Sequence, residues 1–185
     1  MDKVRLLILP VLLAFLTPGC NQPAAYETEI QEIDSLRLRL TGFRVLLDSL
    51  DTEETARLAV HVDTQYNYLL QNYPNQNDRE FWLHEVPQFA DIRKMLTSLG
   101  KKKKGIRQSI EYSDKQLLTL KNSIEDEKLT AEEIKKYLDR EYQAYLSLSF
   151  TFNKYVEGAK RALKLWEINQ EPYDSIVNQL RAEQQ

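Results

Sequence analysis

The sequence predicts an all-α protein, an elongated antiparallel helical bundle with coiled-coil-like packing around one long helix at about residues 131–169. Only five glycines and six prolines occur in 185 residues, which favours helices over a turn-rich β sandwich. Apolar residues recur at steps of three or four along most of the chain, and this spacing places them on one face of a helix. The length is that of one domain.

The longest predicted helix begins at Ala131 and ends near Asn169. Thr130 and Glu133 have the spacing of a capping box, and the next proline is Pro172. Its apolar residues cover so wide an arc that neighbours are needed on more than one side, so we expect it to be central. The main apolar series is Ile134, Leu138, Tyr142, Tyr145, Leu148, Phe152, Tyr155, Ala159, Ala162 and Trp166.

Two helices are predicted before the first loop, at about 27–50 and 53–72. The apolar register of the first helix becomes polar after Leu50, and Asp51 or Thr52 can cap a new start. One continuous rod over 27–72 is the alternative. Gly42 interrupts the first helix, which indicates a slight bend or a close backbone contact there.

Residues 73–77 have loop composition, and Asp78 can cap a short helical turn. Pro87 suits the first turn of a helix that Gly100 would end. Lys101–Lys104 are then expected in a solvated loop, followed by a helix at 106–128 whose apolar series has one polar gap, Ser113. Pro172 would open a short carboxy-terminal helix.

The first helix and the 106–128 helix are expected to flank the tyrosine-rich half of the long helix. The half around Trp166 would then be left to the carboxy-terminal segment or to a second protein. Trp166 therefore decides between these two possibilities: it is either a core residue of this chain or part of an interface with a second protein.

Residues 1–20 have the layout of an export signal: Lys3 and Arg5, an apolar run from 6 to 16, and then Thr-Pro-Gly-Cys. Eleven apolar residues are too few to span a bilayer as a helix. Because Gly19 precedes Cys20, the only cysteine, the stretch resembles the signal and lipobox of bacterial lipoproteins. Thr17 and Pro18 depart from that pattern, and an ordinary cleaved signal peptide is the alternative.

The resemblance implies three segments: a signal peptide at 1–19, a lipidated Cys20 with a tether to residue 26, and a single helical domain at 27–185. It also implies that the lipid on Cys20 holds the protein to a membrane of the bacterial cell envelope. Asn21 follows the cysteine where aspartate is associated with inner-membrane retention, which favours the outer membrane if the cell has one.

The residues offer little support for catalysis. The two histidines, His61 and His84, lie on different predicted helices, and Glu80 with His84 gives two ligands where a zinc site needs at least three. We therefore predict no catalytic residue, no metal and no cofactor. The net charge of −3 gives no general attraction to nucleic acid. Lys101–Lys104 could still form a basic finger for an anionic partner.

Two functions remain. The first is a non-enzymatic, lipid-anchored extracytoplasmic protein that acts through protein–protein interaction or scaffolding, with a partner whose identity the sequence does not give. The alternative is a binding module for a small or extended ligand in a tyrosine-lined groove between helices. Tyr142, Tyr145 and Tyr155 are the candidates for that groove, although tyrosines at helical spacing more often belong to a core.

Overall fold

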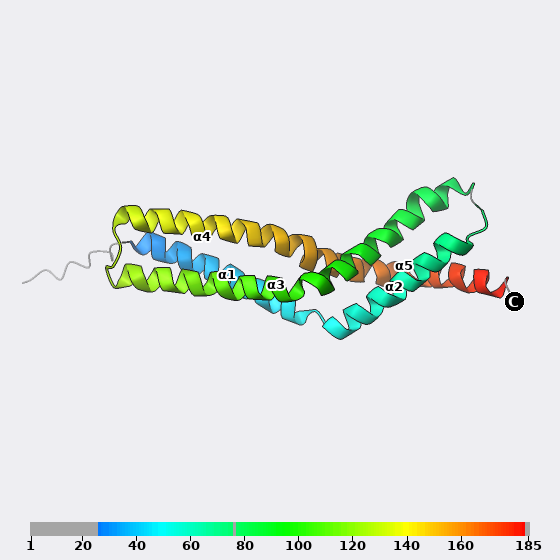
Figure 1. Ribbon diagram of the computed structural model, residues 1–185, viewed down its shortest axis with the longest axis horizontal. Helices are drawn as coiled ribbons and strands as arrows, with labels where there is room; N and C mark the ends of the chain where they lie inside the picture. Colours follow the sequence, from blue (N-terminus) through cyan, green and yellow to red (C-terminus); the bar gives the residue numbers. More distant parts are fainter. Residues whose placement is uncertain (1–25, 76, 184–185) are drawn as a thin grey trace, which may run out of the picture.

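The computed structural model describes residues 26–75 and 77–183, apart from the side chain of Thr52. The described residues form an elongated all-α molecule, with four helical segments and no strand (Figure 1). α3 is in contact with every other long element. The predicted all-α fold class is therefore confirmed. The bundle packs around α3, however, and not around the long helix that begins at Ala131, because α3 contacts helices of both halves of the chain.

The four continuous segments contain five α-helices, which begin and end as follows. α1 is Glu27–Ser49, α2 is Thr52–Asn72, α3 is Val86–Glu125, α4 is Ala131–Phe152 and α5 is Gly158–Ala182. Two π-helical turns, η1 (Phe81–Glu85) and η2 (Asn153–Glu157), lead without a break into α3 and α5. α4, η2 and α5 together form one rod of about 78 Å, at about 1.5 Å per residue.

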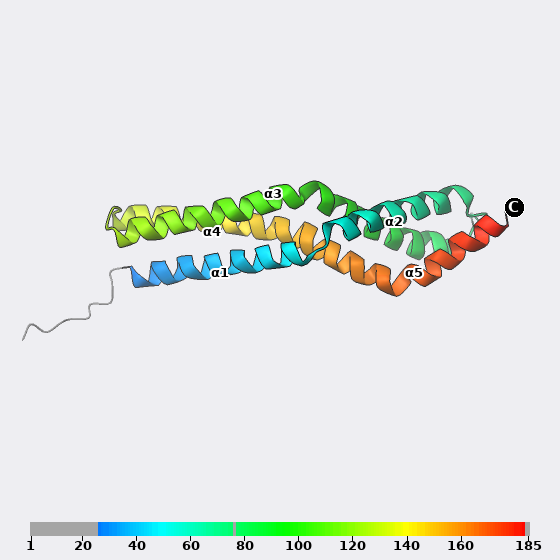
Figure 2. The same cartoon turned by 90° about the horizontal axis from the view of Figure 1, so that it is seen from below.

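The molecule consists of two three-helix bundles placed end to end (Figure 2). We call the half that contains α1, α4 and the carboxy-terminal half of α3 the proximal half. The distal half contains α2, α5 and the amino-terminal half of α3. Each half has its own apolar core. Among the described helices, α3 and the α4–α5 rod pass through both halves, whereas the chain breaks between α1, which lies in one half, and α2, which lies in the other.

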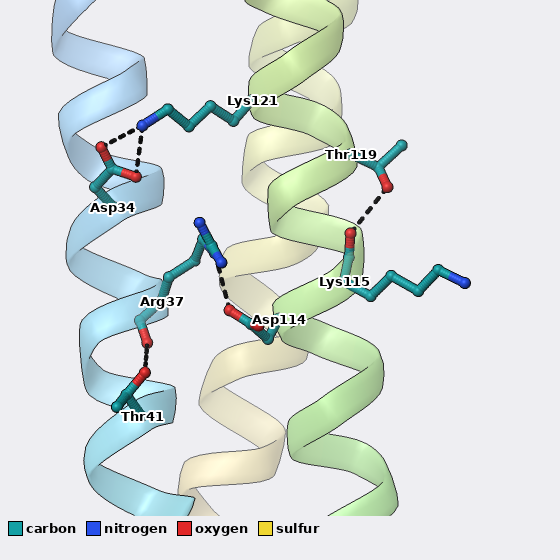
Figure 3. Close-up of polar contacts among 7 residues, drawn as sticks. All are labelled: Asp34, Arg37, Thr41, Asp114, Lys115, Thr119 and Lys121. Carbon is teal, nitrogen blue, oxygen red and sulfur yellow. Dashed lines mark hydrogen bonds and ion pairs between the residues drawn. The ribbon is translucent and has the colours of Figure 1, made fainter.

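The proximal core follows the predicted seams. Phe43 of α1 stacks on Tyr145 and Phe152 of α4, with ring centroids 5.9 and 4.1 Å apart. Polar contacts on the α1–α3 side flank this core (Figure 3): the Lys121 ammonium lies 2.6 Å from Asp34, and Arg37 donates to Asp114 at 2.8 Å. Because these pairs are partly exposed, each contributes at most about 1 kcal/mol, and they mainly fix the register of α1 on α3.

The distal core is aromatic. Phe89 of α3 stacks on Tyr173 of α5 at 4.3 Å and on Trp166 at 5.7 Å. Trp166 is 5% exposed, and His61 of α2 meets its ring edge-on at 5.6 Å. Trp166 is therefore a core residue covered by α2 and α3 as well as by Tyr173 of its own helix.

The turn between α1 and α2 joins the two halves. Asp51 accepts hydrogen bonds from the backbone N–H groups of Glu53 and Glu54 and so caps α2. Lys103 of α3 donates from Nζ to the carbonyl oxygen of Leu50 at 2.7 Å. A cation at this position stabilises the end of α1, where backbone carbonyls lack helical partners.

The predicted helix stop at Gly100 and the loop at Lys101–Lys104 are wrong. α3 runs through both Gly100 and Gly105, neither of which has a positive φ. The buried residues Leu96, Leu99, Ile106 and Ile110 keep one helical register across the segment. Lys103 occupies the intervening position on the inner side. Packing of this continuous face outweighs the cost of two glycines, about 1 kcal/mol each.

The predicted helix start at Pro172 is also wrong, because α5 passes through Pro172. Pro172 itself is exposed, while Trp166, Tyr173 and Val177 are buried on either side of it. The same apolar face thus continues past the proline. The long helix consequently ends at Ala182 instead of about 169 and contains the π turn η2.

Other boundaries are confirmed. The chain breaks between Ser49 and Thr52, which excludes the continuous 27–72 rod, and Thr130 with Glu133 forms the predicted capping box. α1 and the second half of α3 flank the tyrosine-rich α4, as expected. At Gly42 an added Cβ would meet no atom within 4 Å, so the alternative of a close backbone contact is wrong.

Candidate functional site

The predicted lipidation site, Cys20, lies outside the described residues, as do the signal segment 1–19 and the tether up to residue 25. Its lipid therefore stays a prediction. Within the described part of the chain, no helix is both long and apolar enough to cross a bilayer.

The two histidines lie in different places. His61 Nε2 lies 3.8 Å from Asp174 of α5, which also accepts a hydrogen bond from the Gln65 side chain. His84 is exposed on η1. Among residues 26–75 and 77–183, no three His, Cys, Asp or Glu side chains are placed to hold one metal ion.

The three tyrosines of the predicted groove differ in how far they are buried. Tyr145 is 8% exposed and belongs to the proximal core, where Arg39 lies 6.0 Å from its ring centroid. Tyr155 is half-buried against the same core, with the Lys154 ammonium 5.4 Å from its ring. Tyr142 is exposed. Tyr145 and Tyr155 thus belong to core packing, as tyrosines at helical spacing more often do, and ligand binding between the helices stays a prediction.

Exposed apolar side chains instead form a ridge on α4. Tyr142, Leu146 and Phe150 are spaced by four residues and are 41%, 43% and 71% exposed. This spacing places them along one side of the helix. We call these three residues the α4 ridge. An exposed apolar row of this kind is typical of a protein contact surface.

An open cleft of about 770 Å³ lies at the junction of the two halves, between the α1–α2 turn and α5. Lys160, Arg161 and Lys164 of α5 are exposed along it, and no ion pair joins them to a described residue. The cleft is lined by Ser49, Leu50, Asp51, Glu54, Thr55, Leu58, Glu157, Lys160, Arg161, Leu163, Lys164, Trp166, Glu167 and Gln170. We call it the junction cleft.

One acidic residue of the junction cleft, Asp51, already caps a helix of the fold. Backbone N–H groups of Glu54 and Glu53 lower the pKa of Asp51, because they donate to its carboxylate at the start of α2. Three cations, Lys160, Arg161 and Lys164, lie beside Glu157 and Glu167 on the opposite wall, and they are the groups of the cleft that an anionic partner could approach.

A second concave surface, of about 390 Å³, lies between α3 and α4 in the proximal half. Tyr112 and Tyr137 are among its lining residues, and they are 64% and 37% exposed. Burial raises the pKa of Glu141, an effect that the neighbouring Arg140 only partly offsets. We call this surface the α3–α4 groove. Its lining is Tyr112, Ser113, Gln116, Thr119, Leu120, Ser123, Leu129, Tyr137, Arg140, Glu141 and Ala144.

Sequence reasoning missed both concave surfaces. The junction cleft combines residues more than 100 positions apart, and nothing in the local spacing of either segment indicates the other. The α3–α4 groove left one signal in the sequence, the polar gap at Ser113, which lines it. No family model matches the chain, and neither the curated proteins nor the solved structures include a match to it.

Proposed function

We propose that the protein is a non-enzymatic, lipid-anchored component of the bacterial cell envelope that binds a protein partner along the α4 ridge. The membrane attachment is the lipid on Cys20, on the extracytoplasmic side. The partner is another envelope protein that presents an amphipathic helix with an acidic end.

The α4 ridge is the observation that carries the proposal. Phe150 exposes 71% of its surface although a folded chain gains by burying such a ring, by about 25 cal/mol per Å². Leu146 and Tyr142 continue the row by one and two helical turns. A second helix with apolar residues at the same spacing would cover all three side chains.

Charge at the end of the ridge supports the acidic end of the partner. Lys160, on the wall of the junction cleft, follows Phe150 by ten residues, or about 15 Å along the rod. Lys160 and Lys164 lie on the same wall without ion pairs to described residues. A helix lying on the ridge could therefore place its acidic end against these lysines, and this attraction would set its direction.

Site-specific photocrosslinking in intact cells tests the proposal. A benzophenone-bearing amino acid is placed at position 150, and the matched control is position 38. Leu38 lies on α1 and is 73% exposed, so the two positions are equally accessible. We expect an adduct at 150 that is absent at 38, and mass spectrometry of the adduct should identify an amphipathic helix with acidic residues at one end.

Charge reversal provides the second part of the test. Lys160→Glu with Lys164→Glu should reduce the yield of the position-150 adduct, whereas Lys101→Glu with Lys102→Glu, equally exposed on α3, should not. Equal yields from positions 150 and 38 would refute the ridge as the docking face. An adduct consisting of two copies of this chain would show self-association in place of a separate partner.

A further inference from the structure

The α3–α4 groove contains two exposed aromatic rings, Tyr112 of α3 and Tyr137 of α4, and hydrogen-bonding side chains near them. α3 and α4 run antiparallel from the short connection at 126–130, so Tyr112 and Ala144 lie at the end remote from that connection. Ser123 and Leu129 lie at the near end. Gln116, Arg140 and Glu141 fall between the two ends.

The polar groups of the groove can still form hydrogen bonds with a ligand. Thr119 and Ser123 donate their hydroxyl protons to the backbone carbonyls of Lys115 and Thr119, each at 2.9 Å, which leaves the hydroxyl oxygens free to accept (Figure 3 shows the Thr119 bond). Gln116 can donate and accept through its amide, and Arg140 is a donor that is in no ion pair with a described residue. Glu141 is partly desolvated and accepts through two oxygens.

The chemistry of the groove excludes several ligand classes. An extended peptide needs free backbone groups for strand pairing, and those of α3 and α4 are used within the helices. An amphipathic helix needs a continuous apolar row, but polar side chains of both helices, such as Gln116 on α3 and Arg140 on α4, interrupt the apolar lining here. A polyanion such as nucleic acid needs excess positive charge, whereas Arg140 is balanced by Glu141.

An oligosaccharide satisfies the features that remain. A sugar ring has an apolar C–H face, which packs on a tyrosine ring, and an edge of hydroxyl groups that both donate and accept. The volume of about 390 Å³ is within the range of small-ligand sites. We propose that the α3–α4 groove binds a neutral oligosaccharide, with Tyr112 and Tyr137 under its sugar rings and Glu141 and Gln116 on its hydroxyls.

Calorimetric titration of the purified full-length protein tests this proposal. The probes are cellohexaose, maltohexaose, xylohexaose, mannohexaose and chitotetraose, with an acidic galacturonate oligomer as the charged comparison. We expect at least one neutral probe to bind and the acidic oligomer to bind more weakly. Tyr112→Ala and Tyr137→Ala should each weaken the binding by about tenfold, and Glu141→Gln should weaken it too.

The matched control is Leu118→Ala. Leu118 is exposed to nearly the same extent as Tyr137 and lies on α3, but it is outside both the groove and the α4 ridge. Binding should be unchanged in this variant. Because Tyr112 is 64% exposed, its loss leaves the fold intact, which circular dichroism can verify. Failure of all five neutral probes to bind would overturn the proposal, as would binding that tolerates Tyr112→Ala and Tyr137→Ala.

Discussion

Replacement of Gly100 and Gly105 by alanine should stabilise the protein. Both glycines lie inside α3, have negative φ and are exposed. An added Cβ would meet no atom within 4 Å at either position. Alanine therefore introduces no clash and restricts the unfolded chain more than glycine does, which raises the free energy of unfolding.

The size of the effect follows from helix propensity. In a helix interior, exchange of glycine for alanine contributes about 0.5–1 kcal/mol, so the double variant should gain about 1–2 kcal/mol. For a chain of this size, that gain corresponds to a rise in Tm of about 2–8 °C. Gly42→Ala, also inside a helix and free of neighbours, is a matched control and should stabilise by the same amount for one site.

Urea unfolding monitored by circular dichroism at 222 nm measures the change. If Gly100 ended a helix in the left-handed conformation, alanine would cost about 1 kcal/mol and the sign would be reversed. Lys102→Pro provides the opposite perturbation. It should destabilise by about 3 kcal/mol or more, because proline disrupts a helix interior. A neutral Lys102→Pro, or a destabilising Gly100→Ala, would refute the continuous α3.

Three further predictions concern other parts of the chain. Trp166→Ala should cost about 3–5 kcal/mol in urea unfolding, since the indole is buried against Phe89; a loss below about 1 kcal/mol would contradict its place in the core. Burial raises the pKa of Tyr173 to about 12, so the folded state keeps this proton longer than the unfolded state, whose pKa is 10.0. Stability should therefore fall as pH rises from about 10 to 12, and Tyr173→Phe should flatten that fall in unfolding measurements across the interval. Finally, Cys20 should carry lipid: metabolic labelling with an alkyne fatty acid should mark the wild type and not Cys20→Ser, and equal labelling of both would remove the anchor from the proposed function.

Local patterns predicted the helices well where one signal dominated. The capping box at Thr130, the cap at Asp51 and the buried series through Phe89 and Leu99 each depend on residues within two turns of one another. The spacing of residues along the sequence is enough to predict such local interactions. The structure contains each of them at the predicted residues.

The errors arose where tertiary packing overrides local preference. Gly100 and Pro172 both favour helix ends locally, yet the apolar face continues past each, and burial of residues such as Ile106 and Tyr173 is worth more than either local cost. The π turn η2 left no local signal. The two concave surfaces could not be predicted as surfaces, even with the polar gap at Ser113, because their walls come from helices whose pairing depends on the whole topology.

The separation of α1 from the distal half has a mechanical consequence. α1 packs only in the proximal half and is joined to α2 by the short turn at Leu50 and Asp51. A pull applied at the amino-terminal end would therefore load the contacts of α1 first, including the pairs Asp34–Lys121 and Asp48–Arg107. The distal bundle would bear tension only after α1 had sheared from α3. A tethered molecule of this design would yield in two steps, with the second bundle still folded when the first has opened.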